Sequence, residues 1–130
     1  MAKAQSKTQK KIDANIRNAL TDLCENSFKK IDGFQWLTHQ ADFANFPASL
    51  LITCVFESQE QLTEATNLKH CSAIKTAIQA RLLKIGVRFK TLDRQVQFDT
   101  EEACIAENNH DWPLRLAKHT GRAVPHSTRP

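Results

Sequence analysis

The sequence contains one set of side chains that suits a soft metal ion. His70, Cys71, Cys104 and His110 offer the nitrogen and sulfur ligands that zinc prefers. Both cysteines lie within apolar helical patterns, and their spacing brings neither histidine to them. We therefore interpret the cysteines as small buried apolar residues, and we expect no metal site and no cofactor.

A second pair is Cys54 and His39, which the sequence predicts to lie on neighbouring strands. An adjacent imidazolium lowers the pKa of a thiol and makes it a better nucleophile. Cys54, however, lies in the middle of residues 50–56, the most apolar run of the chain. A substrate has poor access to such a strand, so we expect an unreactive thiol.

Asp42 and Glu57 resemble the two acidic residues of a nuclease site of the PD-(D/E)xK type, which holds Mg²⁺ and orients a water molecule. That motif needs a lysine two residues after the second acid, and position 59 is Gln. The three glycines, which are widely separated, form no phosphate-binding loop. A hydrolytic or thiol enzyme is therefore a distant alternative, and no catalytic residue is predicted.

Basic residues gather at the two ends of the chain. Residues 1–11 and 113–130 hold four Lys or Arg each and no acid, whereas residues 12–112 hold ten Lys or Arg against fourteen Asp or Glu. Basic ends of this kind favour the phosphates of nucleic acid or of a ribonucleoprotein, and the alternative is that they only keep the protein in solution. The predicted nucleic-acid-binding residues are Lys3, Lys7, Lys10, Lys11, Arg115, Lys118 and Arg122.

The two tryptophans suggest another kind of surface. Trp is enriched at the centre of protein interfaces, and Trp112 lies between Asp111 and Pro113 in the most distinctive local string of the chain. Exposed Trp36 or Trp112 would suit a protein-interaction or dimerisation module, including a homodimer. The alternative, which we favour, is that Trp112 holds the C-terminal segment against the sheet.

Three helical segments are predicted by apolar residues that recur every three or four positions. The polar face of the first carries Asp13, and Gly33 follows it where a helix C-cap favours positive φ. A capping box that begins at Ser58 opens the second, and Asp99 or Thr100 caps the third. The segments are about 8–32, 58–85 with a break at 66–67, and 99–107.

Four strands are predicted, at residues 34–39, 50–56, 87–90 and 96–98. The run 50–56 is apolar on both faces, which is typical of a central, fully covered strand. The connection between the first two strands is too short for a parallel crossover, so we expect an antiparallel pair. The last two strands alternate apolar and polar residues, and the pattern predicts a hairpin.

This order, α-β-β-α-β-β-α, predicts an α+β fold. We expect a two-layer sandwich in which helices cover one face of a four-stranded, mainly antiparallel sheet. Residues 1–7 form a basic arm, residues 8–117 a single domain and residues 118–130 a basic flexible tail. Since the sequence shows no signal peptide and no run of about 20 apolar residues, we expect a cytoplasmic protein without a membrane partner.

Four strings of residues stand out together: 10–13 (KKID), 32–39 (DGFQWLTH), 46–50 (FPASL) and 98–104 (FDTEEAC). They resemble a family of small gammaproteobacterial proteins that carry the label "Fis family transcriptional regulator". The resemblance would cover about residues 8–117 and implies a bacterial, cytoplasmic, regulatory protein. Fis itself ends in a helix-turn-helix. Residues 114–130 show no second amphipathic helix, so DNA binding through that motif does not carry over.

From the sequence we therefore expect a small non-catalytic bacterial binding protein that is nucleic-acid-associated or regulatory through its basic ends. The alternative is a protein-interaction or dimerisation module with no role in nucleic-acid binding.

Overall fold

The computed structural model describes residues 7–120 and 126–127, with side chains for residues 7–117. The elements follow in the order α1 (Lys7–Asn26), η1 (Phe28–Lys30), β1 (Phe34–Gln40), η2 (Phe43–Asn45), β2 (Leu51–Phe56), α2 (Gln59–Asn67), α3 (His70–Leu83), α4 (Leu92–Gln95), β3 (Val96–Thr100), α5 (Glu101–Asn108), α6 (Trp112–Thr120) and β4 (His126–Ser127).

β2 is the central strand of the sheet. The strand order is β3-β2-β1-β4, in which β1 runs antiparallel to β2 and to β4, and β3 runs parallel to β2. Residues 52–56 are buried, whereas Leu51 is only half-buried. The prediction of a central strand covered on both faces is therefore confirmed.

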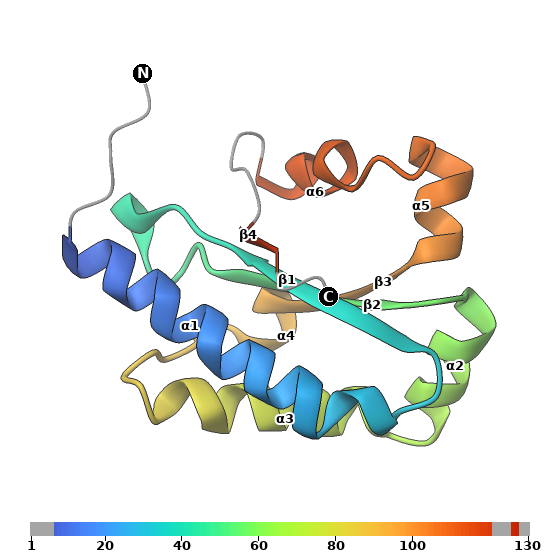
Figure 1. The fold of residues 1–130 in the computed structure, drawn as a ribbon, viewed down its shortest axis with the longest axis horizontal. Coiled ribbons are helices and arrows are strands. Elements are labelled where there is room, and N and C mark those ends of the chain that lie inside the picture. Colours follow the sequence, from blue (N-terminus) through green and yellow to red (C-terminus); the bar gives the residue numbers. More distant parts are fainter. Residues whose placement is uncertain (1–6, 121–125, 128–130) are drawn as a thin grey trace.

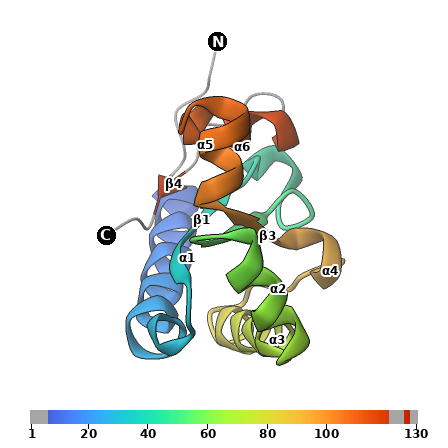
Figure 2. The same ribbon diagram turned by 90° about the vertical axis from the view of Figure 1, so that its right-hand side faces the viewer.

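Helices cover both faces of this sheet (Figures 1 and 2). α1 and α3 lie below it in the view of Figure 1, and α5 and α6 lie above it. Alternate residues of β2 enter two cores: Cys54 lies in the lower core, with α1 and α3, and Val55 lies in the upper core, with α5 and α6. The predicted α+β class is confirmed. The prediction of helices on one face is wrong, because both faces of β2 are apolar and each needs a cover.

Residues 87–90 form a loop instead of the predicted strand. The backbone N–H groups of Lys90 and Thr91 donate to Gln95 Oε1 at 2.9 and 2.8 Å, and Gln95 Nε2 donates to the Leu50 carbonyl at 3.0 Å. A buried side chain thus takes the place of a neighbouring strand. Three of the four predicted strands are present, as β1, β2 and β3. The two-residue β4 comes from the segment predicted as a tail.

The predicted helix boundaries are confirmed at several points. Ser58 Oγ accepts a hydrogen bond from the Gln61 N–H at 3.2 Å, and Thr100 Oγ1 accepts one from the Ala103 N–H at 3.0 Å. Gly33 has a φ of +85°, and a Cβ at this position would lie 2.6 Å from Gln61 Cβ. The turn after η1 therefore requires glycine. The predicted end of the first helix is wrong, because α1 ends at Asn26 and the short helix η1, rather than α1, precedes Gly33.

A buried polar contact joins α1 to the sheet. Asp13 Oδ1 lies 2.8 Å from His39 Nε2, and Asp13 Oδ2 accepts from Arg17 Nη2 at 2.8 Å. Asp13 is only 3% exposed and His39 is fully buried. The assignment of Asp13 to the solvent-facing side of the helix is therefore wrong, because a polar partner on β1 compensates for the burial of its carboxylate.

Replacement of Ile52 by Ala should lower the free energy of unfolding by about 2–5 kcal/mol, because it removes buried apolar surface and leaves a cavity. Ile52 is fully buried. Urea denaturation followed by circular dichroism measures the change. The matched control is Leu51→Ala, one residue earlier on the same strand, which should cost clearly less. Equal losses would contradict the central position of β2.

The thiol of Cys54 should be inert in the folded protein. All four cysteines are free and buried, and desolvation raises the pKa of the Cys54 thiol, so the reactive thiolate is scarce. Titration with a disulfide reagent should detect four thiols in denaturant and none at Cys54 under native conditions. Rapid native labelling of Cys54, located by peptide mapping, would show that the strand is not covered.

Candidate functional site

Both tryptophans lie in the upper core. Trp36 is 4% exposed and Trp112 is 2% exposed, and their rings meet edge to face with centroids 4.9 Å apart. Both indole N–H groups donate to the carboxylate of Glu101, at 3.2 and 2.5 Å. Neither ring offers a surface to a partner, so the prediction of exposed, partner-binding tryptophans is corrected. Trp112 instead holds α6 against the sheet.

Arg115 has carboxylate partners within its own chain. Its Nε and Nη2 donate to the two carboxylate oxygens of Asp99 at 2.6 and 2.9 Å, and its Nη1 donates to Glu107 at 2.8 Å. Its side chain is 14% exposed. Hydrogen bonding to Asp99 is the main cause that raises the pKa of Arg115. This guanidinium fastens α6 to β3 and α5. Because its charge is already paired with two carboxylates, it is not part of the candidate nucleic-acid surface.

Lys7, Lys10 and Lys11 are exposed at the N-terminal end of α1. Of the other residues predicted to bind nucleic acid, Lys3 and Arg122 lie outside the described residues, and Lys118 is described only by its backbone.

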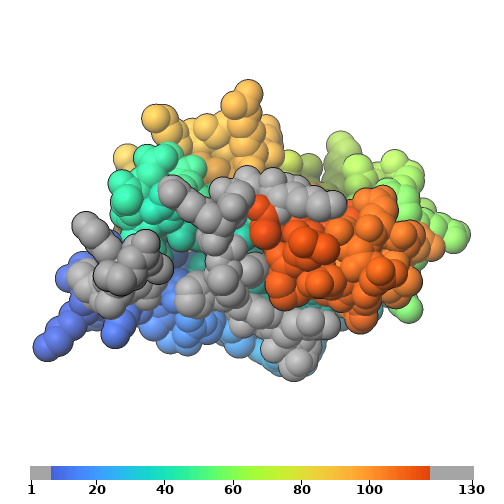
Figure 3. Space-filling model, turned by 90° about the horizontal axis from the view of Figure 1, so that it is seen from above, coloured from blue at the N-terminus to red at the C-terminus, as the bar shows by residue number. Residues whose placement is uncertain are grey.

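Sequence reasoning missed a second basic segment. Residues 69–94 hold seven Lys or Arg and a single acid, Asp93. The negative net charge of residues 12–112 as a whole conceals this positive segment. Figure 1 places the loop after α3 and the N-terminal end of α1 at the same end of the long axis, and in Figure 3 residues 41–50 lie between them. We call the exposed cations of these two segments the basic end: Lys7, Lys10, Lys11, Lys84, Arg88 and Lys90.

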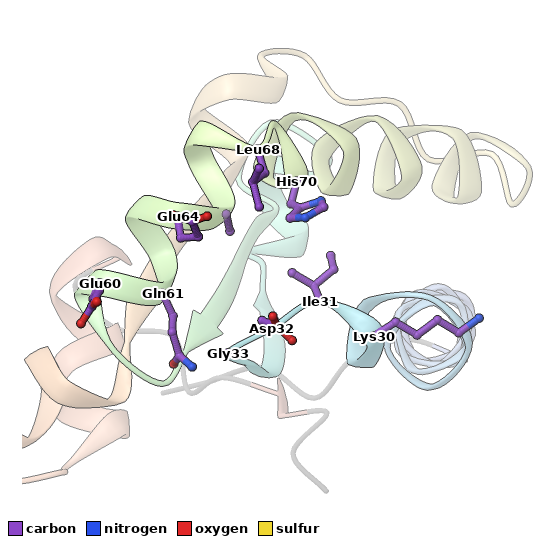
Figure 4. A pocket seen from close by; sticks show the side chains of 10 residues that line it. Lys30, Ile31, Asp32, Gly33, Glu60, Gln61, Glu64, Leu68 and His70 are labelled. Carbon is purple, nitrogen blue, oxygen red and sulfur yellow. The ribbon is translucent and has the colours of Figure 1, made fainter.

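α2 and α5 lie at the end of the long axis opposite the basic end (Figure 1), and carboxylates line the clefts beside them. One cleft, of about 630 Å³, lies between α2 and residues 30–33 (Figure 4), and a second, of about 840 Å³, lies between α2 and α5. Glu60 and Gln61 line both clefts. We call the carboxylates that line them the acidic end: Asp32, Glu57, Glu60, Glu64, Glu101 and Glu102.

The residues considered for a metal site fall into two separate pairs, His70 with Cys71 and Cys104 with His110. Cys71 lies in the lower core and Cys104 in the upper core, on opposite faces of the sheet. His110 Nε2 lies 3.2 Å from Glu101 Oε1, on the side of Cys104. Within residues 7–117, no three His, Cys, Asp or Glu side chains are arranged to hold a metal ion.

The residues considered for catalysis are also separated. His39 contacts Asp13 and pairs across the sheet with Ile52 rather than with Cys54. Asp42 follows the end of β1 and Glu57 follows the end of β2, and the two strands are antiparallel. These two acids therefore lie beyond opposite ends of β2. The structure brings together neither the thiol pair nor the acids of the nuclease motif.

Replacement of Arg115 by Met should lower the free energy of unfolding by about 3 kcal/mol, because it leaves the carboxylate of Asp99 poorly solvated and unpaired. Urea denaturation followed by tryptophan fluorescence is suited to the measurement, since both tryptophans lie in the upper core. The matched control is Arg88→Met, an exposed arginine, for which we expect a change within about 0.5 kcal/mol. A loss no larger than the control's would contradict the role of Arg115 in holding α6.

In the part of the chain that the structure describes, no helix combines the length and the apolar character that a membrane crossing requires. Comparison with known proteins does not test the resemblance to the Fis-labelled family, which stays an expectation. No protein-family model, no curated protein and no solved structure matches this chain.

Proposed function

We propose that this protein is a non-catalytic nucleic-acid-binding protein whose contact surface is the basic end. The observation that carries the proposal is that two basic segments, remote in sequence, lie at the same end of the molecule (Figure 1). Lys10 on α1 and Arg88 after α3 are separated by most of the chain. In space, residues 41–50 lie between the two segments (Figure 3), so their cations are spread over the surface. Such an arrangement suits an extended phosphate backbone better than a small anion.

Within the described residues, no acidic side chain neutralises the six cations of the basic end. All fourteen acids of the chain lie within the described residues, and none of them makes an ion pair with these six side chains. Other cations are paired: Arg81 with Asp22 at 3.5 Å, for example. The charge of the basic end is therefore available to an external polyanion.

The position of two lysines in the first turn of α1 also supports a binding role. The N-terminal end of a helix carries partial positive charge, so cations there cost about 0.3–1 kcal/mol each instead of stabilising the helix. The first turn of α1 contains no acid. Lys7 and Lys10, in this first turn, are thus unfavourable for the isolated fold and become favourable once phosphates approach.

The separation of the residues considered for catalysis supports the non-catalytic part of the proposal. A regulatory role, as the resemblance to the Fis-labelled family implies, would be compatible with such a surface. Recognition would follow phosphate geometry and would show little preference among sequences.

Binding to unrelated DNA duplexes should weaken with salt, because each neutralised phosphate releases counterions. Fluorescence anisotropy between about 50 and 200 mM salt should give a slope of log K against log salt of about −3 to −5. Lys10→Gln/Lys11→Gln and Lys84→Gln/Arg88→Gln should each reduce the magnitude of the slope by about 1.8.

The matched control is Lys29→Gln/Lys30→Gln. It removes two exposed cations from η1, which follows α1 at the end of the molecule opposite the basic end. The slope should not change. Absence of binding at low salt, or an equal effect of all three double variants, would contradict the proposal, provided that circular dichroism shows each variant to be folded.

A further inference from the structure

Large exposed aliphatic side chains occur at both charged ends. Within the described residues, Leu68 is 58% exposed, Leu83 is 51%, Ile105 is 57% and Leu114 is 54%. Leu68 and Ile105 each line one of the two clefts of the acidic end. Leu83 is the last residue of α3, beside the basic end.

Each cleft therefore presents an aliphatic side chain within a group of carboxylates. In Figure 4, Leu68, His70 and Ile31 face the cleft between α2 and η1, whereas the side chain of Lys30 points away from it. Within residues 7–117, the carboxylates of Glu60 and Glu64 have no ion-pair partner. Apolar surface surrounded by unneutralised charge is the composition of a docking surface.

We infer that the acidic end of one molecule binds the basic end of a second copy of this chain, so that molecules associate head to tail. The second copy is the partner that we infer because its basic end is complementary in charge to the acidic end. At the basic end the exposed Leu83 is followed in the chain by the exposed Lys84 and Arg88, and at the acidic end Leu68 lines the same cleft as Glu60 and Glu64. Association would pair charges that the single molecule leaves unneutralised, and it would bury an aliphatic side chain from each partner.

The two surfaces are unlike each other and lie at opposite ends of the long axis (Figure 1), so one molecule presents both at once. A contact between unlike surfaces continues from copy to copy unless a rotation closes it into a ring. The inference does not require nucleic-acid binding, because it concerns the acidic end as much as the basic end. A monomeric protein that binds DNA would therefore reject the inference and leave the proposed function intact.

Sedimentation velocity of the full chain, from about 10 μM to about 1 mM, tests the association itself. At a salt concentration of about 0.01 M the average mass should rise past that of a dimer, and at about 1 M, where charges are screened within about 3 Å, it should return to that of the monomer. A protein that stays monomeric throughout the low-salt series would overturn the inference.

Complementary charge reversals test the head-to-tail geometry. Glu60→Lys/Glu64→Lys retains only a functional basic end, and Lys84→Glu/Arg88→Glu retains only a functional acidic end. Each variant alone should be monomeric at low salt, because both of its ends carry charge of the same sign. An equimolar mixture should associate again, because the native ends of the two variants attract each other and so do the two reversed ends. Failure of the mixture to associate, or a dimer formed by either variant alone, would contradict this geometry. If a reversal prevents folding, Glu60→Gln/Glu64→Gln should still weaken association about tenfold.

A pair of leucine variants tests the apolar part of the contact without a change in charge. Leu68→Ser should weaken association at low salt, whereas Leu114→Ser, a similarly exposed leucine that lines neither cleft, should not. Equal effects would overturn the assignment of the cleft that Leu68 lines. A monomeric chain whose acidic end binds a lysine-rich peptide would show that the occupant is a different basic partner, and it would also overturn the inference.

Discussion

The structure depends on the burial of β2 on both faces. Its side chains are apolar on each side, so one layer of helices cannot remove them all from water. α1 and α3 cover one face, and α5 and α6 cover the other. The upper layer is fastened by polar contacts. Arg115 makes a bidentate pair with Asp99, and the indole N–H groups of both tryptophans donate to Glu101. The lower layer is held mainly by its apolar core and by the contact between Asp13 and His39.

Much of the fold could be predicted because its signals are local. The apolar run of β2, the cap formed by Ser58 and the glycine after η1 each act through neighbouring residues. The wrong predictions concern contacts between residues far apart in sequence. Residues 87–90 alternate like a strand, but the side chain of Gln95 accepts from the N–H groups of Lys90 and Thr91, and Val87 is buried without a strand partner. Asp13 looks solvent-facing until the fold brings His39 to it.

The candidate site was less predictable for the same reason. The lysines of α1 could be identified from the sequence. The other cations of the basic end lie more than seventy residues later, in a positive segment that the negative net charge of residues 12–112 conceals. The carboxylate partners of Arg115 could not be predicted from the sequence pattern, because they lie eight and sixteen residues before it. The fold turns this uneven sequence into a molecule with two unlike ends. Nucleic acid and a second copy of the chain would compete for the same basic end.

The central claim is that the basic end, and no other surface, contacts nucleic acid. Amide chemical shifts recorded by NMR during titration with a short DNA duplex test it residue by residue in a single experiment. We expect the perturbed amides to lie in residues 7–18 and 84–91, with the amides of α2 and α5 unchanged. Perturbations centred on α5 and α6, or spread evenly over the chain, would contradict the claim.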